Sequence, residues 1–581
     1  MALEGVSQGM DQSEAQTAGR SKTTQAHSSS GVLKAAGAMG AATFLSRMMG
    51  LVREQVFAYL FGAGNMTDAY QVAFRIPNLL RDLFAEGAMS ASLVPTFTRT
   101  RHEEGDVRAW RVVGLVFRVL LSLVGVLSVI GVIFAPQLVN LYASAFHQVP
   151  GKFELTVRMT REMFPFFPLV ALAAAFMGVL NACGVFFLPA FASALFNLAS
   201  VLIGVILARV FLTWGANWGV HPIEGMAIGV VVGGAVQAFC QLPSLYKKGY
   251  RWVTQRGQDP VWHQDPRLRQ MLWMMVPGTV GLAATQVNLL VNTVLATSQG
   301  PGAVSWLNYA FRLMQFPIGI FGVSLASATL PRVSEQWVKK DFSAVNDTLT
   351  RSLRMVFAVN LPASAGLAFL GFPIIELIFQ YGRFHPSDAE ATALALAMYA
   401  VGLTAYSAVK VLVPACYAMG NTRIPVISSV LSVGLTILLN TWMVKPLGYW
   451  GLALGTSIAA IFNAAFLLNA LYRILGERGE RVQIRAILSG LCAYAGLALS
   501  MGFLCYFSHK GLRVWISDEV LVESLGKAGV WIARLLRVGI LMVEGLSWVL
   551  VLSYFFKLEE FQIAFHLFTK KFKNKLSRKQ S

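Results

Sequence analysis

Fourteen long apolar segments constrain this chain more than any other feature of its sequence. A helix of about 20 apolar residues crosses the ~30 Å hydrocarbon core of a bilayer, and each segment is long enough to do so. Charged residues make up only 13% of the chain, against about 25% in ordinary globular proteins. The apolar excess must face lipid, which excludes a soluble enzyme and predicts an all-α polytopic membrane protein with about 14 transmembrane helices. The segments cover residues 33–62, 67–97, 112–142, 159–183, 186–212, 224–246, 268–298, 303–330, 352–380, 388–418, 423–444, 449–474, 483–507 and 530–556.

The distribution of lysine and arginine predicts the orientation of these spans. If the N-terminus is cytoplasmic, the inner segments hold 30 of the 48 basic residues and the outer loops and outer helix ends hold 10. Cytoplasmic loops of membrane proteins carry such an excess, so we expect both termini in the cytoplasm. Because orientation accounts for most of the net charge of +19, no nucleic-acid partner is needed to explain it.

A faint internal repeat predicts two lobes. GAAT at Gly40–Thr43 is matched by LAAT at Leu282–Thr285, and AFR at Ala73–Arg75 is matched at Ala310–Arg312. The offset equals six spans, so the copies share one orientation, as in two parallel six-helix lobes related by an axis along the membrane normal. The predicted organisation is a disordered cytoplasmic tail (1–32), an N-lobe (33–246), a cytoplasmic linker (247–267), a C-lobe (268–474), an extra helix pair (483–556) and a basic cytoplasmic tail (557–581).

Eight basic residues fall within the apolar segments, where each costs at least ~2.5 kcal/mol at a helix centre. They are Arg47, Arg53, Arg75, Arg81, Arg118, Arg209, Arg312 and Lys410. Arg118 and Arg209 lie near helix ends, so we expect them to extend to the membrane surface. Lys410 lies in mid-segment and is expected to face the interior.

The first two spans hold the densest set of these arginines. Arg47 and Arg53 lie about 120° apart around a helix, and Arg75, Asn78 and Arg81 recur every three residues. Pro77 can break the second helix locally. The carboxylates of this region are too few to neutralise every arginine, and they are Glu54, Asp68, Asp82 and Glu86. A cationic cavity of this kind suits an anionic ligand, since the guanidinium fork matches phosphate oxygens, although structural salt bridges are the alternative.

The motifs of other chemistries are absent from the sequence. It contains no Walker A loop, HExxH or GxSxG motif, and its eight histidines fall in tails or loops. The five cysteines lie in or beside apolar runs without CxxC spacing and are expected to be structural. Membrane transport is the remaining class, with no cofactor and with a membrane potential or ion gradient as the driving force.

Four stretches carry a resemblance to a known family. They are FLSRMMGLVREQVFAYLFGAGNMTDAYQVAFRIPNLLRDLFAEGAMSASLVP (Phe44–Pro95), VSWLNYAFRLMQFPIGIFGVSLA (Val304–Ala326), FQYGRF (Phe379–Phe384) and KVLVPACYA (Lys410–Ala418). Together they resemble the MurJ/MviN family of bacterial lipid II flippases, which belongs to the MOP exporter superfamily. The resemblance implies two six-helix lobes around a central cavity, with two extra C-terminal helices that form a lipid groove.

The resemblance also implies a substrate site and raises the question of an ion site. The implied substrate-binding positions are Arg47, Arg53, Asp68, Asn78, Arg81, Ser305 and Arg312. Two positions beside Arg312 that are acidic in better-known members are Phe311 and Gln315 here. Some relatives have a sodium site in the second lobe, and the matching helices of this chain offer Asn288, Asn440 and Thr456. Coupling to sodium or to protons therefore stays open.

The function implied is translocation of lipid II, the undecaprenyl-diphosphate-linked disaccharide-pentapeptide, by alternating access. Such a protein is expected to act as a monomer in the bacterial inner membrane, among membrane lipids, and to serve peptidoglycan biosynthesis, cell-wall biogenesis and cell shape. Three alternatives remain: a flippase for another undecaprenyl-diphosphate-linked glycan, a MATE-like cation-coupled exporter, and a membrane enzyme acting on the same lipid. The exporter would need acidic cavity residues, and the enzyme would need a nucleophile or a metal site.

Overall fold

A computed structural model describes residues 40–83, 88–251, 265–516, 527–558 and 560 of the chain. The predicted tail 1–32, most of the linker 247–267, nearly all of the tail 557–581 and Glu86 lie outside the described residues. Across the described ranges the regular structure is helical and contains no strand. Eleven helices within them are long and apolar enough to cross a membrane. The remaining three predicted spans also contain helices, so the prediction of an all-α membrane protein is confirmed.

The contacts within the chain divide it into two compact units. The first comprises the residues up to Arg53 together with Ile76–Ala135 and Met159–Thr279, and the second comprises Glu54–Arg75, Pro136–Arg158 and the residues from Val280 onward. The helix over residues 40–61, α2 (Asn65–Arg81), α6 (Lys152–Met163) and α11 (Pro266–Thr297) each contribute to both units. The lobes inferred from the repeat follow the sequence, whereas the units follow contacts, so the lobe boundaries stay a prediction.

Close helix contacts made by glycine organise the first unit. Its other helices are α3 (Ala88–Glu104), α4 (Asp106–Ile133), α7 (Phe166–Ala182), α8 (Phe187–Trp218), α9 (Glu224–Phe239) and α10 (Leu242–Lys247). Gly225, Gly229 and Gly233 recur every four residues on α9 and pack against the backbone of α8. A Cβ at any of the three would lie within 2.7 Å of an α8 backbone atom. Small residues at this spacing let two helices approach closely without a hydrophobic driving force between them.

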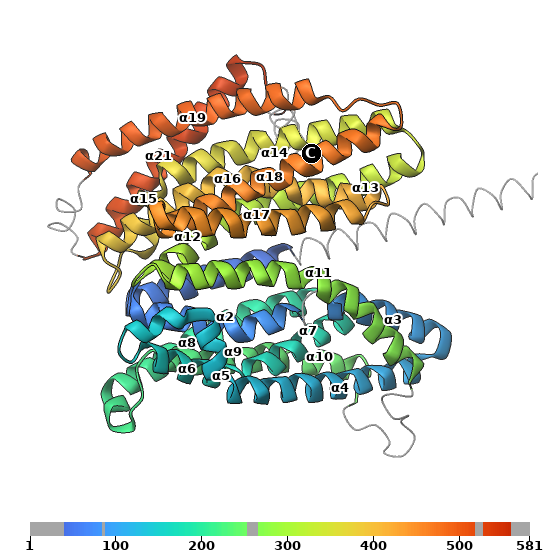
Figure 1. Cartoon of the computed structure of the whole chain (residues 1–581), viewed down its shortest axis with the longest axis vertical. Helices are drawn as coiled ribbons and strands as arrows, with labels where there is room; N and C mark the ends of the chain where they lie inside the picture. Colours follow the sequence, from blue (N-terminus) through green and yellow to red (C-terminus); the bar gives the residue numbers. More distant parts are fainter. Residues whose placement is uncertain (1–39, 84–87, 252–264, 517–526, 559, 561–581) are drawn as a thin grey trace, which may run out of the picture. The chain divides into compact units, whose positions relative to one another are not determined.

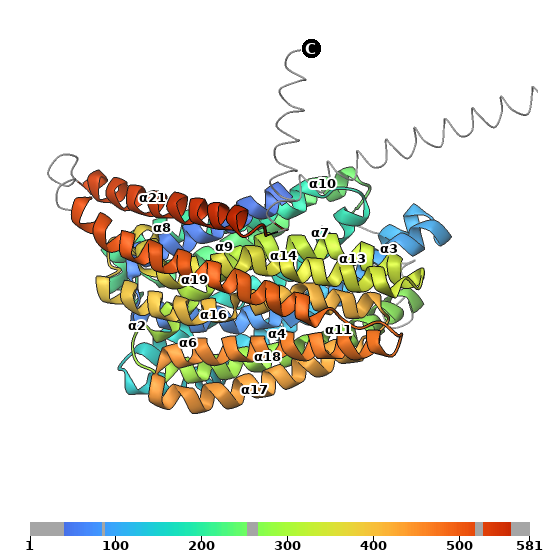
Figure 2. The same ribbon diagram turned by 90° about the horizontal axis from the view of Figure 1, so that it is seen from above.

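The second unit is a larger bundle built around α16 (Figure 1). Its helices include α12 (Ala303–Pro317), α13 (Val323–Val338), α14 (Phe342–Phe369), α15 (Gly371–Phe379), α16 (Pro386–Ala418), α17 (Arg423–Leu447) and α18 (Tyr449–Gly476). The second unit also contains two shorter elements, the 3₁₀ turn η2 (Ser144–Gln148) and α5 (Ala135–Ala143). The first residue of α5, Ala135, belongs to the first unit. The final pair, α19 (Ile484–Trp515) and α21 (Lys527–Phe555), packs on α14 and α15 at the side of this bundle (Figure 2). The extra pair expected after the twelfth span is therefore attached to the second unit.

Prolines within the helices have different local effects. Pro77 lies inside α2, which continues to Arg81, so the prediction of a local break there is wrong. Pro317 is the last residue of α12, and the helical path continues through η4, a single π-helical turn over Ile318–Gly322, directly into α13. The ring of proline removes one backbone donor, and a widened turn next to it accommodates the lost hydrogen bond without ending the helix.

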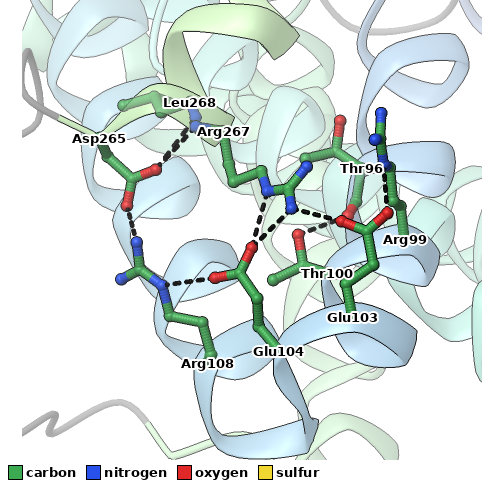
Figure 3. Close-up of polar contacts among 9 residues, drawn as sticks. All are labelled: Thr96, Arg99, Thr100, Glu103, Glu104, Arg108, Asp265, Arg267 and Leu268. Carbon is green, nitrogen blue, oxygen red and sulfur yellow. Dashed lines mark hydrogen bonds and ion pairs between the residues drawn. The ribbon is translucent and has the colours of Figure 1, made fainter.

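A network of ion pairs fixes the start of α11 to the corner between α3 and α4 (Figure 3). The guanidinium of Arg267 donates to Glu104 at 2.8 Å and to Glu103 at 2.5 Å. Arg108 joins Glu104, at 3.3 Å, to the buried Asp265, at 2.8 Å. Asp265 also accepts from the backbone N–H of Arg267 at 2.9 Å, so the same carboxylate serves the first turn of α11.

This network should make stability depend on pH in the acid range. Hydrogen bonds from Arg99 and then Arg267 lower the pKa of Glu103, and the bond from Arg267 lowers the pKa of Glu104. Because both pKa values are depressed in the folded state, the stabilisation is complete above about pH 4.3 and is lost as the pH falls through the lower folded values. In detergent, Arg267→Gln should lower the melting temperature at pH 7, and this difference should vanish in acid.

Two controls separate the network from a general effect of charge. Arg99 bonds Glu103 within α3, so Arg99→Gln should lower the melting temperature less than Arg267→Gln does. The Arg267 difference should also shrink at ~1 M salt, where the Debye length is about 3 Å, because these side chains are partly exposed. A difference that persists unchanged at low pH would contradict this role for the network.

Candidate functional site

Asp68 is one of the predicted site residues that the protein encloses completely. It lies in the first turn of α2, is fully buried, and belongs to the same unit as α12. Its Oδ1 accepts from the backbone N–H of Ser305 at 3.0 Å and from the Ser305 hydroxyl at 2.7 Å, and its Oδ2 accepts from the N–H of Gly302 at 2.7 Å. These donors surround the start of α12, where a carboxylate is favoured by the helix dipole. The structure therefore brings Asp68 and Ser305 into direct contact.

Gly302 shapes the backbone turn that donates hydrogen bonds to this carboxylate. It has a φ of 91°, a left-handed conformation that a residue with a side chain rarely adopts. A Cβ on Gly302 would lie 2.6 Å from the ring of Trp306. The indole N–H of Trp306 donates to Asp388 at 3.0 Å, so the turn before α12 is also held from α16.

Lys152 neutralises Asp68, although the sequence indicated only a basic residue in an outer loop. Its Nζ lies 3.4 Å from Asp68 Oδ2 and 3.0 Å from Asn65 Oδ1. The same ammonium lies 3.9 Å from the ring centroid of Phe146, and Lys152 is only 5% exposed. A buried carboxylate and a buried ammonium thus form one network with the start of α12.

Arg312 and Arg75 have partners within the second unit. Arg312 Nε lies 3.8 Å from Glu54 Oε1, and the carboxylate is buried while the arginine is 44% exposed. Glu54 supplies from another helix the acidic group that positions Phe311 and Gln315 lack. Arg75 donates to the hydroxyl of Thr293 at 2.7 Å, which lies on α11.

The other predicted substrate-binding residues lie in the first unit. Arg81 donates to Asp82 at 2.7 Å, with both side chains about one quarter exposed. Arg53 is buried, with its guanidinium 5.9 Å from the ring centroid of Phe196, whereas Arg47 is exposed. Arg81 and Arg312 therefore each lie beside a carboxylate, that of Asp82 and that of Glu54. The carbonyl oxygen of Asn78 is buried and accepts no hydrogen bond from the described residues.

The arginines expected to reach the membrane surface are exposed. Arg118 on α4 and Arg209 on α8 both lie on the surface of their unit, and Arg118 donates to the carbonyl of Gly114 on its own helix at 3.3 Å. Lys410 on α16 is exposed as well, so the helices of its own unit do not enclose it.

The three polar residues considered for a coupling ion form part of one chain of amides and hydroxyls. Asn440 on α17 donates to Asn292 at 2.5 Å and to Thr456 on α18 at 3.3 Å, while Asn292 donates to Asn288 at 3.4 Å. Asn440 Oδ1 is buried and accepts no hydrogen bond from the described residues. The described residues contain no group of three or more His, Cys, Asp or Glu side chains that could hold a metal ion. This run of amides and hydroxyls could offer an ion only neutral oxygen ligands.

The sequence missed Lys152, Glu54 as the partner of Arg312, and Asn292 as the link between Asn288 and Asn440. The contacts of Lys152 with Asp68, of Arg312 with Glu54 and of Asn292 with Asn440 join residues far apart in the chain, and no spacing rule connects them. The one signal for Asn292 was its position four residues after Asn288, on the same face of a helix.

The fold is similar to that of solved multi-pass membrane transporters. It aligns with a structure of lipid II flippase MurJ in an inward closed conformation at a TM-score of 0.70 and 24% identity, covering 89% of this chain and 98% of that one. It also aligns with an inward-facing multidrug resistance MATE family transporter at a TM-score of 0.63 and 15% identity, covering 75% of this chain and 95% of that one. At these identities the likeness shows the fold alone.

The sequence comparisons define the family within that class. Residues 57–526 match the family described as lipid II flippase MurJ. The lipid II flippase MurJ of Burkholderia cenocepacia is 35% identical over 83% of this chain and 92% of its own length, and a probable lipid II flippase MurJ of Bdellovibrio bacteriovorus is 34% identical over 81% and 88%. The chain belongs to the MurJ family. Its relatives are transporters rather than enzymes, and it is a multi-pass protein of the inner membrane.

Proposed function

We propose that this chain moves lipid II from the cytoplasmic to the outer leaflet of the inner membrane, with both of its termini in the cytoplasm. The observation that carries the proposal is the family match over residues 57–526, together with relatives that are named lipid II flippases. The acyl chain stays in lipid while the diphosphate headgroup passes through the protein.

The diphosphate is held by arginines inside the membrane region. Arg53 is buried, and Arg81 and Arg312 each keep part of the side chain exposed beside a carboxylate. An arginine that already pairs with a carboxylate can exchange that partner for a phosphate, since the fork geometry suits both. Arg47 and Asn78 are the further positions proposed to bind the substrate.

Transport proceeds by alternating access around this site. The contact of Asp68 with Gly302 and Ser305 joins the corner between the helix over residues 40–61 and α2 to the start of α12. In the proposed cycle this contact is made when the outer end is closed and is released when the outer end opens. The hydrogen bonds to the Asp68 carboxylate are charge-assisted, and such bonds are strong enough to stabilise the state in which the outer end is closed.

The driving force is the membrane potential or an ion gradient of sodium or protons, since the sequence has no nucleotide-binding motif. One elementary charge moved through 100 mV is worth about 2.3 kcal/mol, which is enough to bias such a cycle. The chain of Asn288, Asn292, Asn440 and Thr456 is the proposed ion site, with neutral oxygen ligands.

The test is to express the chain in a bacterium whose own lipid II flippase can be depleted. Growth should be rescued, and externally added lipid II-cleaving enzyme should gain access to lipid II at about the rate that the native flippase gives. Collapse of the membrane potential and ion gradients should stop this access. Rescue of a strain deficient in another undecaprenyl-linked glycan, without rescue of lipid II transport, would favour the glycan alternative, and export of organic cations would favour a MATE-like exporter.

A further inference from the structure

The loop that joins α15 to α16 is held on one side by α21. This loop carries the FQYGRF sequence, none of whose residues belongs to the proposed substrate site. Arg534 on α21 donates from Nη1 to the backbone carbonyls of Glu376 at 3.0 Å and Gln380 at 2.9 Å. Its guanidinium also lies 5.3 Å from the ring centroid of Tyr381.

The contact between Arg534 and this loop is buried and involves opposite charges. Arg534 is 7% exposed, and its Nη2 lies 3.7 Å from the carboxylate of Glu376. The 2% exposed Arg537, one turn further along α21, lies 3.7 Å from the other oxygen of the same carboxylate. The planar guanidinium thus binds two backbone carbonyls through Nη1 while its Nη2 lies beside a buried carboxylate, a spread of donors that the single nitrogen of lysine does not provide.

The other side of the loop supports the end of the first helix. The backbone N–H of Arg383 donates to the carbonyl of Tyr59 at 3.0 Å, and the amide of Gln55 donates to the carbonyl of Ile378 at 2.8 Å. The two segments meet at glycines. A Cβ on Gly382 would lie 2.2 Å from the carbonyl oxygen of Tyr59, and a Cβ on Gly62 would lie 2.3 Å from the carbonyl oxygen of Arg383. Contact this close exists only because both positions lack a side chain.

The same corner leads directly to Asp68. The carbonyl of Gly62 accepts from the hydroxyl of Thr67 at 2.9 Å, and Thr67 immediately precedes Asp68 in the chain. All of these groups belong to the second unit. A continuous path of contacts therefore runs from α21, through the loop, to the corner that presents Asp68 to α12.

From this path we infer that Arg534 is a positioning residue for transport: through the FQYGRF loop it sets the corner between the helix over residues 40–61 and α2, and so stabilises the contact of Asp68 with Ser305. The helix pair α19 and α21 thereby acts on the closure of the outer end, in addition to any contact it makes with the lipid chain. This inference rests on the proposed flippase function for its effect on transport, but its structural part can be tested separately.

The experiment measures transport and the exposure of the corner in the same membranes. Gly64 lies in the corner with open space around it, so Gly64→Cys in a background without the native cysteines reports access to a membrane-impermeant thiol reagent added from outside. Arg534→Gln should raise the labelling rate of this cysteine roughly tenfold, the effect of losing a charge-assisted hydrogen bond, and should lower lipid II externalisation by a similar factor. Arg534→Lys should give intermediate values of both.

Matched controls distinguish positioning from a general loss of structure. Arg513 is an exposed arginine near the end of α19, so Arg513→Gln should change neither quantity. A cysteine at Gly511, also in open space, should label at the same rate in all variants. If Arg534→Gln fails to reach the membrane, Gly382→Ala perturbs the same contact without touching α21 and should also raise labelling at Gly64.

The outcomes separate the two proposals. Unchanged labelling at Gly64 in both Arg534→Gln and Gly382→Ala would overturn the inference, whatever happens to transport. Increased labelling in a chain whose parent moves no lipid II would support the positioning role and reject the proposed function instead.

Discussion

An Asp68→Asn variant should fail to support growth when the host flippase is depleted, and lipid II externalisation should fall at least about a hundredfold. Removing one member of a buried ion pair typically costs 3–5 kcal/mol, because the remaining charge is left uncompensated. Here the remaining charge is Lys152, which is 5% exposed. The new amide would also direct an N–H group toward one of the donors on Gly302 or Ser305, which now face carboxylate oxygens. Externalisation and the amount of protein in the membrane are the measurements.

Two companion variants separate stability from activity. Asp68→Asn combined with Lys152→Met removes both charges, so it should restore the melting temperature and the membrane level but not transport. Ser305→Ala removes one hydroxyl bond and keeps both backbone donors, so it should reduce transport only a fewfold. Wild-type transport by Asp68→Asn would show that this carboxylate does not hold the outer end closed.

The helices of this fold could be predicted from the sequence almost completely. The physical reason is that a bilayer demands about 20 consecutive apolar residues and internally satisfied backbone groups, and both requirements are local. Pro77 shows the limit of local rules. Its ring removes one donor, yet α2 continues four residues beyond it to Arg81, because the packing of the surrounding helix outweighs a single lost hydrogen bond.

The candidate site could be predicted only in part. The cost of burying charge selected the arginines, and the resemblance to the family added Asp68 and Ser305. Neither source could pair Lys152 with Asp68 across 84 positions, or find the contact between Gln55 and Ile378, at the end of α15, across 323 positions. Such pairs depend on how helices pack in three dimensions, which the periodicity of a single helix does not record.

Alanine at Arg53, Arg81 or Arg312 should each lower lipid II externalisation by at least about tenfold, whereas alanine at Arg118 or Arg209 should have little effect. A hydrogen bond to a charged group contributes about 1.5–3 kcal/mol, and the first three arginines are proposed to bind the diphosphate. Arg118 and Arg209 are exposed on their helices and lie within reach of the membrane surface. Removing a charge from the membrane region eases insertion, so all five variants should reach normal membrane levels.

The carboxylate partners make this comparison sharper. Glu54 is buried beside Arg312, so Arg312→Ala removes a cation from beside this carboxylate, and the double variant with Glu54→Gln removes the negative charge as well while still lacking the phosphate ligand. If the double variant stays inactive, the loss belongs to substrate binding; if it recovers, Arg312 serves only to neutralise Glu54. Lysine should restore part of the activity where charge alone matters and none where the planar fork grips two oxygens. Equal tolerance of alanine at Arg53, Arg81 and Arg118 would reject the cationic site, and the family assignment would remain, because it depends on the sequence match rather than on these side chains.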